Sequence, residues 1–157
     1  QKRGYMERFE SNVSRIKELK LLTSIPGIGP VRANKLVGIM VTPHRFDDKY
    51  HLFSYAMLIK HDRRSDGKSY GKKRAHGQSM LKEGFKSSVL SSKKSNTAFK
   101  RKYDEMRAAG KDDRVARSAL ARMIAATVLA VWKSGKKYND KQWEVTRRRN
   151  QNSHSGN

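Results

Sequence analysis

Hydrophobic residues recur at intervals of three and four along most of the chain, a spacing typical of amphipathic helices. In residues 1–22, Met6, Phe9, Val13 and Ile16 follow this spacing and predict a helix. Two interpretations of that helix stay open. It is either an ordinary surface helix or the end of a coiled coil that enters from further upstream.

Glycine and proline interrupt the pattern between residues 22 and 37. The run Pro26-Gly27-Ile28-Gly29-Pro30 predicts a tight turn, because glycine accepts positive φ and proline suits the first turn of a helix. An apolar helical face follows, formed by Ala33, Leu36, Val37 and Met40. The segment therefore predicts two helices joined by a hairpin, a helix-hairpin-helix element.

Helical spacing returns twice in the middle of the chain. Residues 46–59 predict a loop and then a helix, with Asp47 or Asp48 as its N-terminal cap. Residues 79–92 predict another helix, because apolar residues recur there at every fourth position.

Two more helices are expected towards the C-terminus. Asn96 is the expected cap of the first, and Gly110 is its natural end. The second is long and apolar; it opens at Asp112 or Asp113 and closes at Gly135.

Two segments lack the helical pattern. Residues 60–78 are rich in glycine, serine and basic residues and predict a long loop or an irregular ribbon, while residues 141–157 predict a disordered basic tail. We see no internal repeat and no convincing strand pattern. The expected fold is all-α: a coiled-coil-like helix over residues 1–21, then a compact helical domain over residues 22–140 that carries the hairpin and the basic loop, and finally the tail.

The charge of the chain indicates a polyanionic partner. Lys and Arg number 36 against 14 Asp and Glu, a formal net charge of +22. Nucleic acid is the partner that such an excess favours, and an anionic membrane surface is the second choice. No apolar run approaches the roughly 20 residues that span a bilayer. The absence of cysteine excludes disulfides and thiolate metal sites.

The hairpin predicts a phosphate-binding site. Backbone N–H groups at the start of a helix lack intrahelical acceptors, and the positive end of the helix dipole attracts anions. The candidate ligands are the backbone of Gly27, Ile28 and Gly29, with Arg32 and Lys35 adding charge. The alternative is a plain turn between helices that needs its glycines only for packing.

The basic loop and the helix after it form the electrostatic centre of the chain. Fourteen basic residues and three acidic ones lie between Lys60 and Lys102. Glycines there let the backbone approach a phosphate, and an aromatic ring can stack on a base or sugar. The candidate nucleic-acid-binding residues of this region are Arg63, Arg64, Lys68, Tyr70, Lys72, Lys73, Arg74, Lys82 and Lys86. The alternative is a solvated basic surface.

Catalytic patterns are scarce. No pair of carboxylates has a two-metal arrangement, the five histidines lack metal-ligand spacing, and no glycine-rich loop matches a nucleotide-binding pattern. The remaining nucleophile candidates are two serines of the basic loop, Ser65 and Ser69. Arginines beside Ser65 can stabilise its alkoxide and hold a scissile phosphate.

Several short motifs follow one another along residues 20–140. They are Leu22-Thr23-Ser24-Ile25-Pro26-Gly27-Ile28-Gly29-Pro30-Val31, Arg45-Phe46, Phe53-Ser54-Tyr55-Ala56, Arg64-Ser65-Asp66-Gly67-Lys68, Leu81-Lys82, Ala119-Leu120-Ala121-Arg122 and Trp132-Lys133-Ser134-Gly135-Lys136-Lys137-Tyr138. In this order they resemble the C-terminal domain of the DEDD-type insertion-sequence transposases, the IS-one-ten family. The hairpin alone is not specific, but its combination with the Ser-Asp-Gly-Lys loop and the closing motif is.

The resemblance implies a DNA recombinase of the prokaryotic cytoplasm and nucleoid. Upstream it implies a coiled coil and a RuvC-like domain whose four acidic residues bind Mg²⁺, whereas this fragment itself is expected to hold no metal or cofactor. Its implied partners are element-end DNA, target DNA, a structured guide RNA and further copies of the same protein. Without the RuvC-like domain, the fragment is expected to bind nucleic acid but not to recombine DNA alone.

The resemblance also implies a serine nucleophile that forms a covalent link to DNA. The matching stretch is Ser65-Asp66-Gly67, so the role falls on Ser65, with Ser69 as the alternative. Asp66 and Met57 stand where glycine is commoner in the family.

Two other classes of protein fit the composition. One is a non-catalytic helix-hairpin-helix module of a repair or architectural protein, in which no serine matters. The other is a ribosomal or other RNA-structural protein, which would prefer a folded RNA to duplex DNA and form no adduct. All three interpretations predict binding that weakens steeply with salt.

Overall fold

The computed structural model describes the backbone of residues 2–65, 68–74 and 78–154, and the side chains of residues 13–59 and 78–153. The body of the protein is all-helical, as predicted. In chain order its helices are α1 (Lys2–Thr23), α2 (Pro30–Met40), the short 3-10 helix η1 (Pro43–Arg45), α3 (Lys49–Tyr55), α4 (Ser79–Ser92), α5 (Ala98–Ala108), α6 (Asp113–Ser134) and α7 (Asp140–His154).

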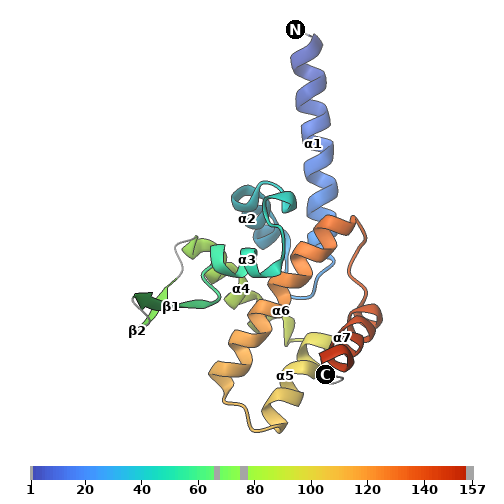
Figure 1. Cartoon of the computed structure of the whole chain (residues 1–157). Helices are drawn as coiled ribbons and strands as arrows, with labels where there is room; N and C mark the ends of the chain where they lie inside the picture. The colour runs from blue at the N-terminus through green and yellow to red at the C-terminus, as the bar shows by residue number, and fades with distance from the viewer. Residues whose placement is uncertain (1, 66–67, 75–77, 155–157) are drawn as a thin grey trace.

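Helix α6 runs through the middle of the body, and the end of α1 together with α3, α4 and α5 packs around it (Figure 1). Among the described residues, it is the helix long and apolar enough to cross a membrane by length and composition. Ten of its residues are buried inside the domain, however, so it is the core helix around which the others assemble.

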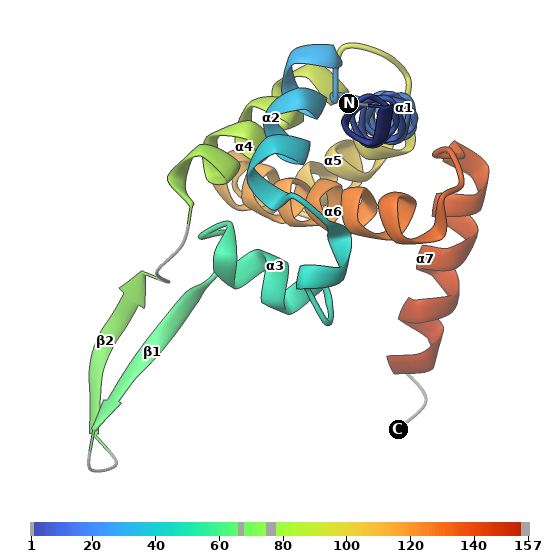
Figure 2. The same ribbon diagram turned by 90° about the horizontal axis from the view of Figure 1, so that it is seen from above.

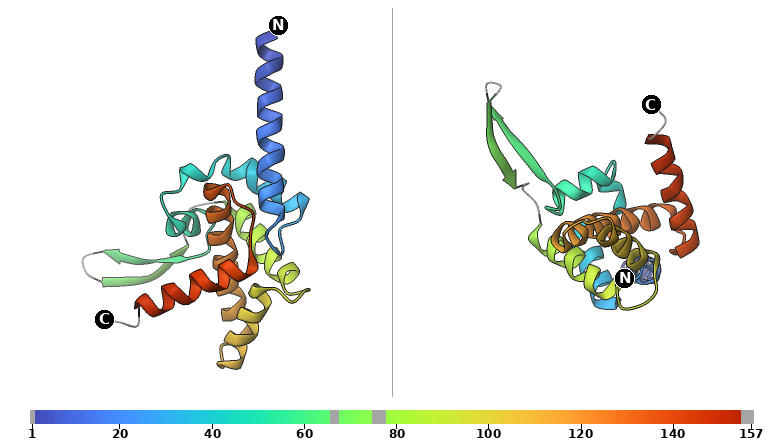
Figure 3. Two further views of the ribbon diagram at one scale, coloured as in Figure 1. Left: turned by 90° about the vertical axis from the view of Figure 1, so that its right-hand side faces the viewer. Right: turned by 90° about the horizontal axis from the view of Figure 1, so that it is seen from below.

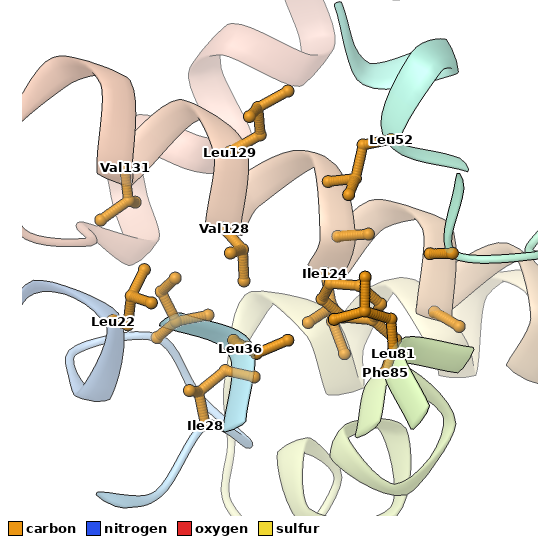
Figure 4. Packing of buried hydrophobic residues seen from close by; sticks show 14 of the residues in the cluster. Leu22, Ile28, Leu36, Leu52, Leu81, Phe85, Ile124, Val128, Leu129 and Val131 are labelled. Carbon is orange, nitrogen blue, oxygen red and sulfur yellow. The ribbon is translucent and has the colours of Figure 1, made fainter. Parts of the chain in front are cut away.

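The hydrophobic core forms where the hairpin region and α4 meet α6. Leu22 and Leu36 come from either side of the hairpin, Phe85 comes from α4, and Ile124 and Val128 come from α6 (Figure 4). Phe85, Ile124 and Val128 are completely inaccessible to solvent. Truncating a phenylalanine at such a position costs about 3–5 kcal/mol, so this junction is a main source of stability.

Several helices begin or end at or next to the capping residues that the sequence predicts. Of the two candidate caps for α3, Asp48 accepts a hydrogen bond from the His51 amide at 2.8 Å. Helix α5 is capped by Thr97, one residue after the expected Asn96. Gly110, at the end of α5, has a φ of 86°, a conformation that glycine adopts without strain.

Helix α1 continues beyond the body as a straight rod (Figure 1). Near the middle of the rod, the side chains of Val13 and Ile16 are 50% and 53% exposed. The predicted helix is confirmed, and it carries exposed apolar side chains at Val13 and Ile16.

Of the two predicted alternatives for residues 60–78, a long loop or an irregular ribbon, the structure has the ribbon. Strand β1 (Lys60–Ser65) pairs antiparallel with β2 (Lys68–Arg74), with an irregularity between Asp62 and Arg64. The expectation of no strand in the chain is therefore wrong here. The ribbon projects away from the helices (Figure 2), and its strands show no apolar alternation in their sequence.

The predicted disordered tail is also wrong over most of its length, because residues up to His154 continue as α7. The helix is fixed at its beginning by Trp143, whose ring packs edge-on against Phe99 with centroids 5.0 Å apart. The indole N–H of Trp143 donates to the hydroxyl of Thr127 at 2.9 Å. Tertiary contacts of this kind thus order a segment whose own composition is polar.

Candidate nucleic-acid interface

The turn between α1 and α2 is built by burying two isoleucines. Ile25 and Ile28 are 1% and 3% exposed, and the Ile28 amide donates to the Ile25 carbonyl at 3.0 Å. Gly27 has a φ of 90°, and a Cβ at this position would collide with the carbonyl oxygen of Ser88 in α4. Gly27 is therefore required for packing as well as for the turn.

Gly29 differs from Gly27. It is the N-cap residue of α2 in an extended conformation, and a Cβ added there would meet nothing within 4 Å. The amides of Val31 and Arg32 follow in the first helical turn, where no intrahelical acceptor exists. Among the predicted hairpin ligands, this open start of α2 is the part that a phosphate can approach.

Arg32 is bound to α4. Its guanidinium donates to the hydroxyls of Ser87 at 3.0 Å and Ser91 at 2.9 Å, and to the Gly27 carbonyl at 3.1 Å. The side chain is half-buried and clamps the turn to α4. Lys35, one turn further along α2, is exposed.

A shallow, open depression of ≈ 480 Å³ lies beside the turn. It is lined by the hairpin from Thr23 to Gly29 and by Ser91, Ser95 and Thr97 around the junction between α4 and α5. Arg32 also lines it. Hydroxyls, a guanidinium and the start of a helix are donors that suit a phosphate group.

The ribbon concentrates positive charge outside the helical body. Seven Lys or Arg residues and a single acid, Asp62, lie in its two strands. Ser65 is the last residue of β1 and the cross-strand neighbour of Lys68, while Ser69 is the neighbour of Arg64. Both candidate nucleophiles therefore lie at the far end of the ribbon.

Four residues singled out by the sequence lie outside the described residues: Asp66 and Gly67 of the Ser-Asp-Gly motif, and His76 and Gly77 beyond β2.

The helical body holds both ends of the ribbon. The Gln78 amide, just after the ribbon, donates to the carbonyl of Tyr55 at 2.8 Å. On the other side the Leu58 amide donates to the Phe53 carbonyl at 2.8 Å. Met57, the residue directly before Leu58, adopts a φ of 56°. The chain thus leaves α3 through a backbone conformation that favours glycine. Glycine is also the commoner residue at this position in the transposases that the sequence resembles.

Helix α4 follows the ribbon directly and carries two further predicted ligands. Lys86 is exposed, and Lys82 lies one turn earlier and is half-buried with a partner. The predicted nucleic-acid ligands thus fall into two groups, one at the hairpin and one along the ribbon and the start of α4.

Among the described residues, no group of three or more histidine or acidic side chains is placed to hold a metal ion. His51 packs its ring edge-on against Phe46 with centroids 5.4 Å apart, which gives it a structural role. The carboxylates of α7 have partners of their own. Asp140 and Glu144 both bind Arg101, at 2.7 and 2.8 Å.

Asp140 organises a polar network that sequence reasoning missed. It accepts hydrogen bonds from the Ala98 amide at 2.9 Å, the Tyr138 hydroxyl at 2.7 Å and Arg101. Burial by itself raises the pKa of Asp140, but these three hydrogen bonds outweigh it and lower the pKa below its ordinary value. Burial and the bond to Asp140 raise the pKa of Tyr138. The residues are distant in sequence, so no local pattern signals the network.

Comparison with known protein families matches the part of the chain that carries the hairpin and the ribbon. Residues 19–104, more than half of the chain, match the model of the family described as "Transposase IS116/IS110/IS902 family". No curated protein matches the chain. The matched region begins near the end of α1 and includes the hairpin, the ribbon, α4 and most of α5. The chain is a member of this insertion-sequence transposase family.

Proposed function

We propose that this chain is the nucleic-acid-binding and serine-nucleophile domain of a transposase that recombines DNA under the guidance of a structured RNA. The position of Ser65 carries the proposal. It ends β1 at the tip of the strongly basic ribbon, with Lys68 as its cross-strand neighbour, in a chain of a transposase family. A hydroxyl among cations is where a phosphodiester can be both held and attacked.

The chemical step is a transesterification at phosphorus. The Oγ of Ser65 forms a bond to the scissile phosphorus, and the bond from phosphorus to one sugar oxygen breaks. The hydroxyl proton leaves to solvent, and the departing sugar oxygen takes up a proton in exchange. Cations of the ribbon neutralise the charge that grows on the non-bridging oxygens. The covalent phosphoserine link conserves the energy of the DNA backbone for rejoining.

Binding of the DNA relies on the two basic regions together. The open start of α2, with Gly29 and exposed Lys35, supplies backbone donors and charge for one phosphate group. The ribbon and Lys86 supply charge along a second stretch of backbone. Contacts of this kind position a nucleic acid without reading its sequence, which suits a protein whose target is chosen by a paired RNA.

The metal chemistry of the family is assigned to a separate RuvC-like domain. Among the described residues, no three histidine or acidic side chains lie together where they could hold a metal ion. No step proposed for Ser65 uses a metal. Helix α1, with Val13 and Ile16 exposed on its rod, is proposed as the end of the coiled coil through which copies of the transposase associate.

Comparing Ser65→Ala with Ser69→Ala in the full-length transposase tests the proposal. With element-end DNA, target DNA and the RNA transcribed beside the element, Ser65→Ala should reduce strand exchange on the order of 10³-fold or more. DNA binding should be retained, because neither change removes a charge. Ser69→Ala should still recombine. Normal recombination by the Ser65 variant would show the assignment to be wrong and favour a non-catalytic binding module.

A further inference from the structure

Helix α7 separates its charges between two sides. Its acids, Asp140 and Glu144, are directed to the body and are taken up by Arg101 of α5, at 2.7 and 2.8 Å. Beyond Glu144 the sequence contains no further acid, and Arg148 and Arg149 are both exposed. Beyond Glu144, every charged side chain of α7 is therefore positive.

The contacts described between α7 and the body lie between Asp140 and Arg147. Trp143 packs on Phe99 and binds Thr127, as described above. Arg147 is half-buried; its guanidinium lies over the Trp143 ring, 5.3 Å from the centroid, and donates to the sulfur of Met123 at 2.9 Å. Arg147 is thus a packing residue, and the turns that follow it extend past the body.

The free end of α7 points to the same side of the domain as the ribbon. Seen from above, both arms leave the body in one direction, with α3 between them (Figure 2). The view from below and the side view agree (Figure 3). Exposed Lys49 and Tyr50 lie on α3 between the arms. One side of the molecule therefore carries two basic arms, of which the proposed function uses only the ribbon.

We propose that the exposed face of α7 is a second DNA-binding arm that docks in the major groove of duplex DNA; this inference rests on the proposed function. A helix with its side chains is about 10–12 Å across, and the B-form major groove is about 12 Å wide. The major groove of A-form RNA is deep and too narrow for side chains to read, so the helix selects DNA. Arg149 and Asn152, one turn apart and both exposed, are residue types that pair with guanine and adenine edges.

The first test compares two charge-matched double variants of the 157-residue chain on a pool of DNA duplexes with a randomised centre. Arg148→Gln/Arg149→Gln removes two charges from α7. Lys111→Gln/Arg114→Gln removes two exposed charges, one from the turn after α5 and one from the first turn of α6. The α7 variant should lose about tenfold in affinity, with a salt slope smaller by about two, while the control changes less than about twofold. Unaltered thermal unfolding of both variants checks the fold.

The second test identifies the groove. Duplexes selected from the pool by the wild-type chain are rebuilt with deazapurines, which lack the ring-nitrogen acceptor of the major groove but keep every phosphate. The wild-type chain should bind them several-fold more weakly, and the α7 variant should show no such difference.

Failure of the inference and failure of the proposed function give different results. If wild type and control bind duplex DNA and the α7 variant binds equally well, the inference alone is wrong. It is also wrong if the α7 variant loses affinity for a structured RNA but not for duplex DNA. If the wild-type chain binds no duplex at all, the proposed function fails and the inference with it.

Discussion

The guanidinium of Arg32 donates to the hydroxyl of Ser91 at 2.9 Å, across 59 residues of sequence. The same guanidinium also holds Ser87 and the carbonyl of Gly27. Arg32 thus connects the hairpin to α4, the helix that follows the basic ribbon, and its role is to stabilise the fold. Lys35, which is exposed, is the residue proposed to bind nucleic acid.

Replacing Arg32 should affect stability first. Arg32→Ala removes three hydrogen bonds made by a charged donor in a half-buried position and should lower the free energy of unfolding by about 1–2 kcal/mol. The matched change Lys35→Ala should leave stability within about 0.5 kcal/mol but reduce the salt slope of DNA binding by about one. Urea unfolding and salt titrations measure the two effects. If both variants lose the same free energy of unfolding, Arg32 does not stabilise the fold by joining the hairpin to α4.

The two glycines of the hairpin should respond differently to alanine. Gly27→Ala combines a φ of 90° with a collision at Ser88 and should destabilise the protein by about 2 kcal/mol or more. Gly29→Ala meets open space and should leave thermal unfolding nearly unchanged, while its methyl group hinders the approach of a phosphate and weakens DNA binding. If Gly29→Ala binds DNA as the wild type does, the start of α2 is not a phosphate site.

Met57 stores backbone strain at the entrance to the ribbon. Its φ of 56° costs a non-glycine residue about 1–2 kcal/mol of folded-state strain. Glycine avoids this strain, but its greater conformational freedom in the unfolded state offsets part of the gain. Met57→Gly should therefore be more stable than Met57→Ala by about 1 kcal/mol, since both lose the same side chain and only glycine relieves the strain. Chemical denaturation of the two variants measures the difference, and an alanine variant as stable as glycine would refute the strain.

The Asp140 network should make the docking of α7 sensitive to acid. Because the folded pKa of Asp140 is lowered, its contribution to stability is fully present above the unfolded value and is lost as the pH falls through the folded pKa. Asp140→Asn should be less stable than wild type near about pH 7, and the difference should narrow as the pH falls below about 4. Fluorescence of Trp143 in a Trp132→Phe background follows the docking. A difference that stays constant down to acid pH would exclude the linkage.

Exposed apolar residues of α1 should control association of the full-length protein. Ile16→Glu places a charge on the proposed coiled-coil face and should shift the protein towards smaller species in sedimentation. Val115→Glu, at a similarly exposed valine in α6, is the control and should leave association unchanged. The coiled-coil proposal fails if the two variants sediment alike.

Features fixed by local chemistry could be predicted from the sequence. The bounds of α4 at Ser79 and Ser92 follow from its apolar spacing, and the end of α5 follows from Gly110, because each signal lies within a few residues of its effect. The two segments without a helical pattern were harder. The ribbon forms by pairing between two strands, and α7 is held by side chains such as Trp143 that contact residues far away in sequence.

The candidate site divides in the same way. The basic character of the ribbon and the position of Ser65 within it could be read from residue types, since charge needs no fold to be counted. The clamping role of Arg32 and the outward face at Arg148 depend on which surface is covered, and a single sequence does not show that.

The most direct test is to capture the covalent intermediate. Full-length transposase is incubated with element-end DNA and its adjacent RNA and then denatured, and any protein–DNA adduct is digested and mapped by mass spectrometry. We expect an adduct on Ser65 that is absent from the Ser65→Ala variant. Tight DNA binding with no adduct, or an adduct on another residue, would contradict it.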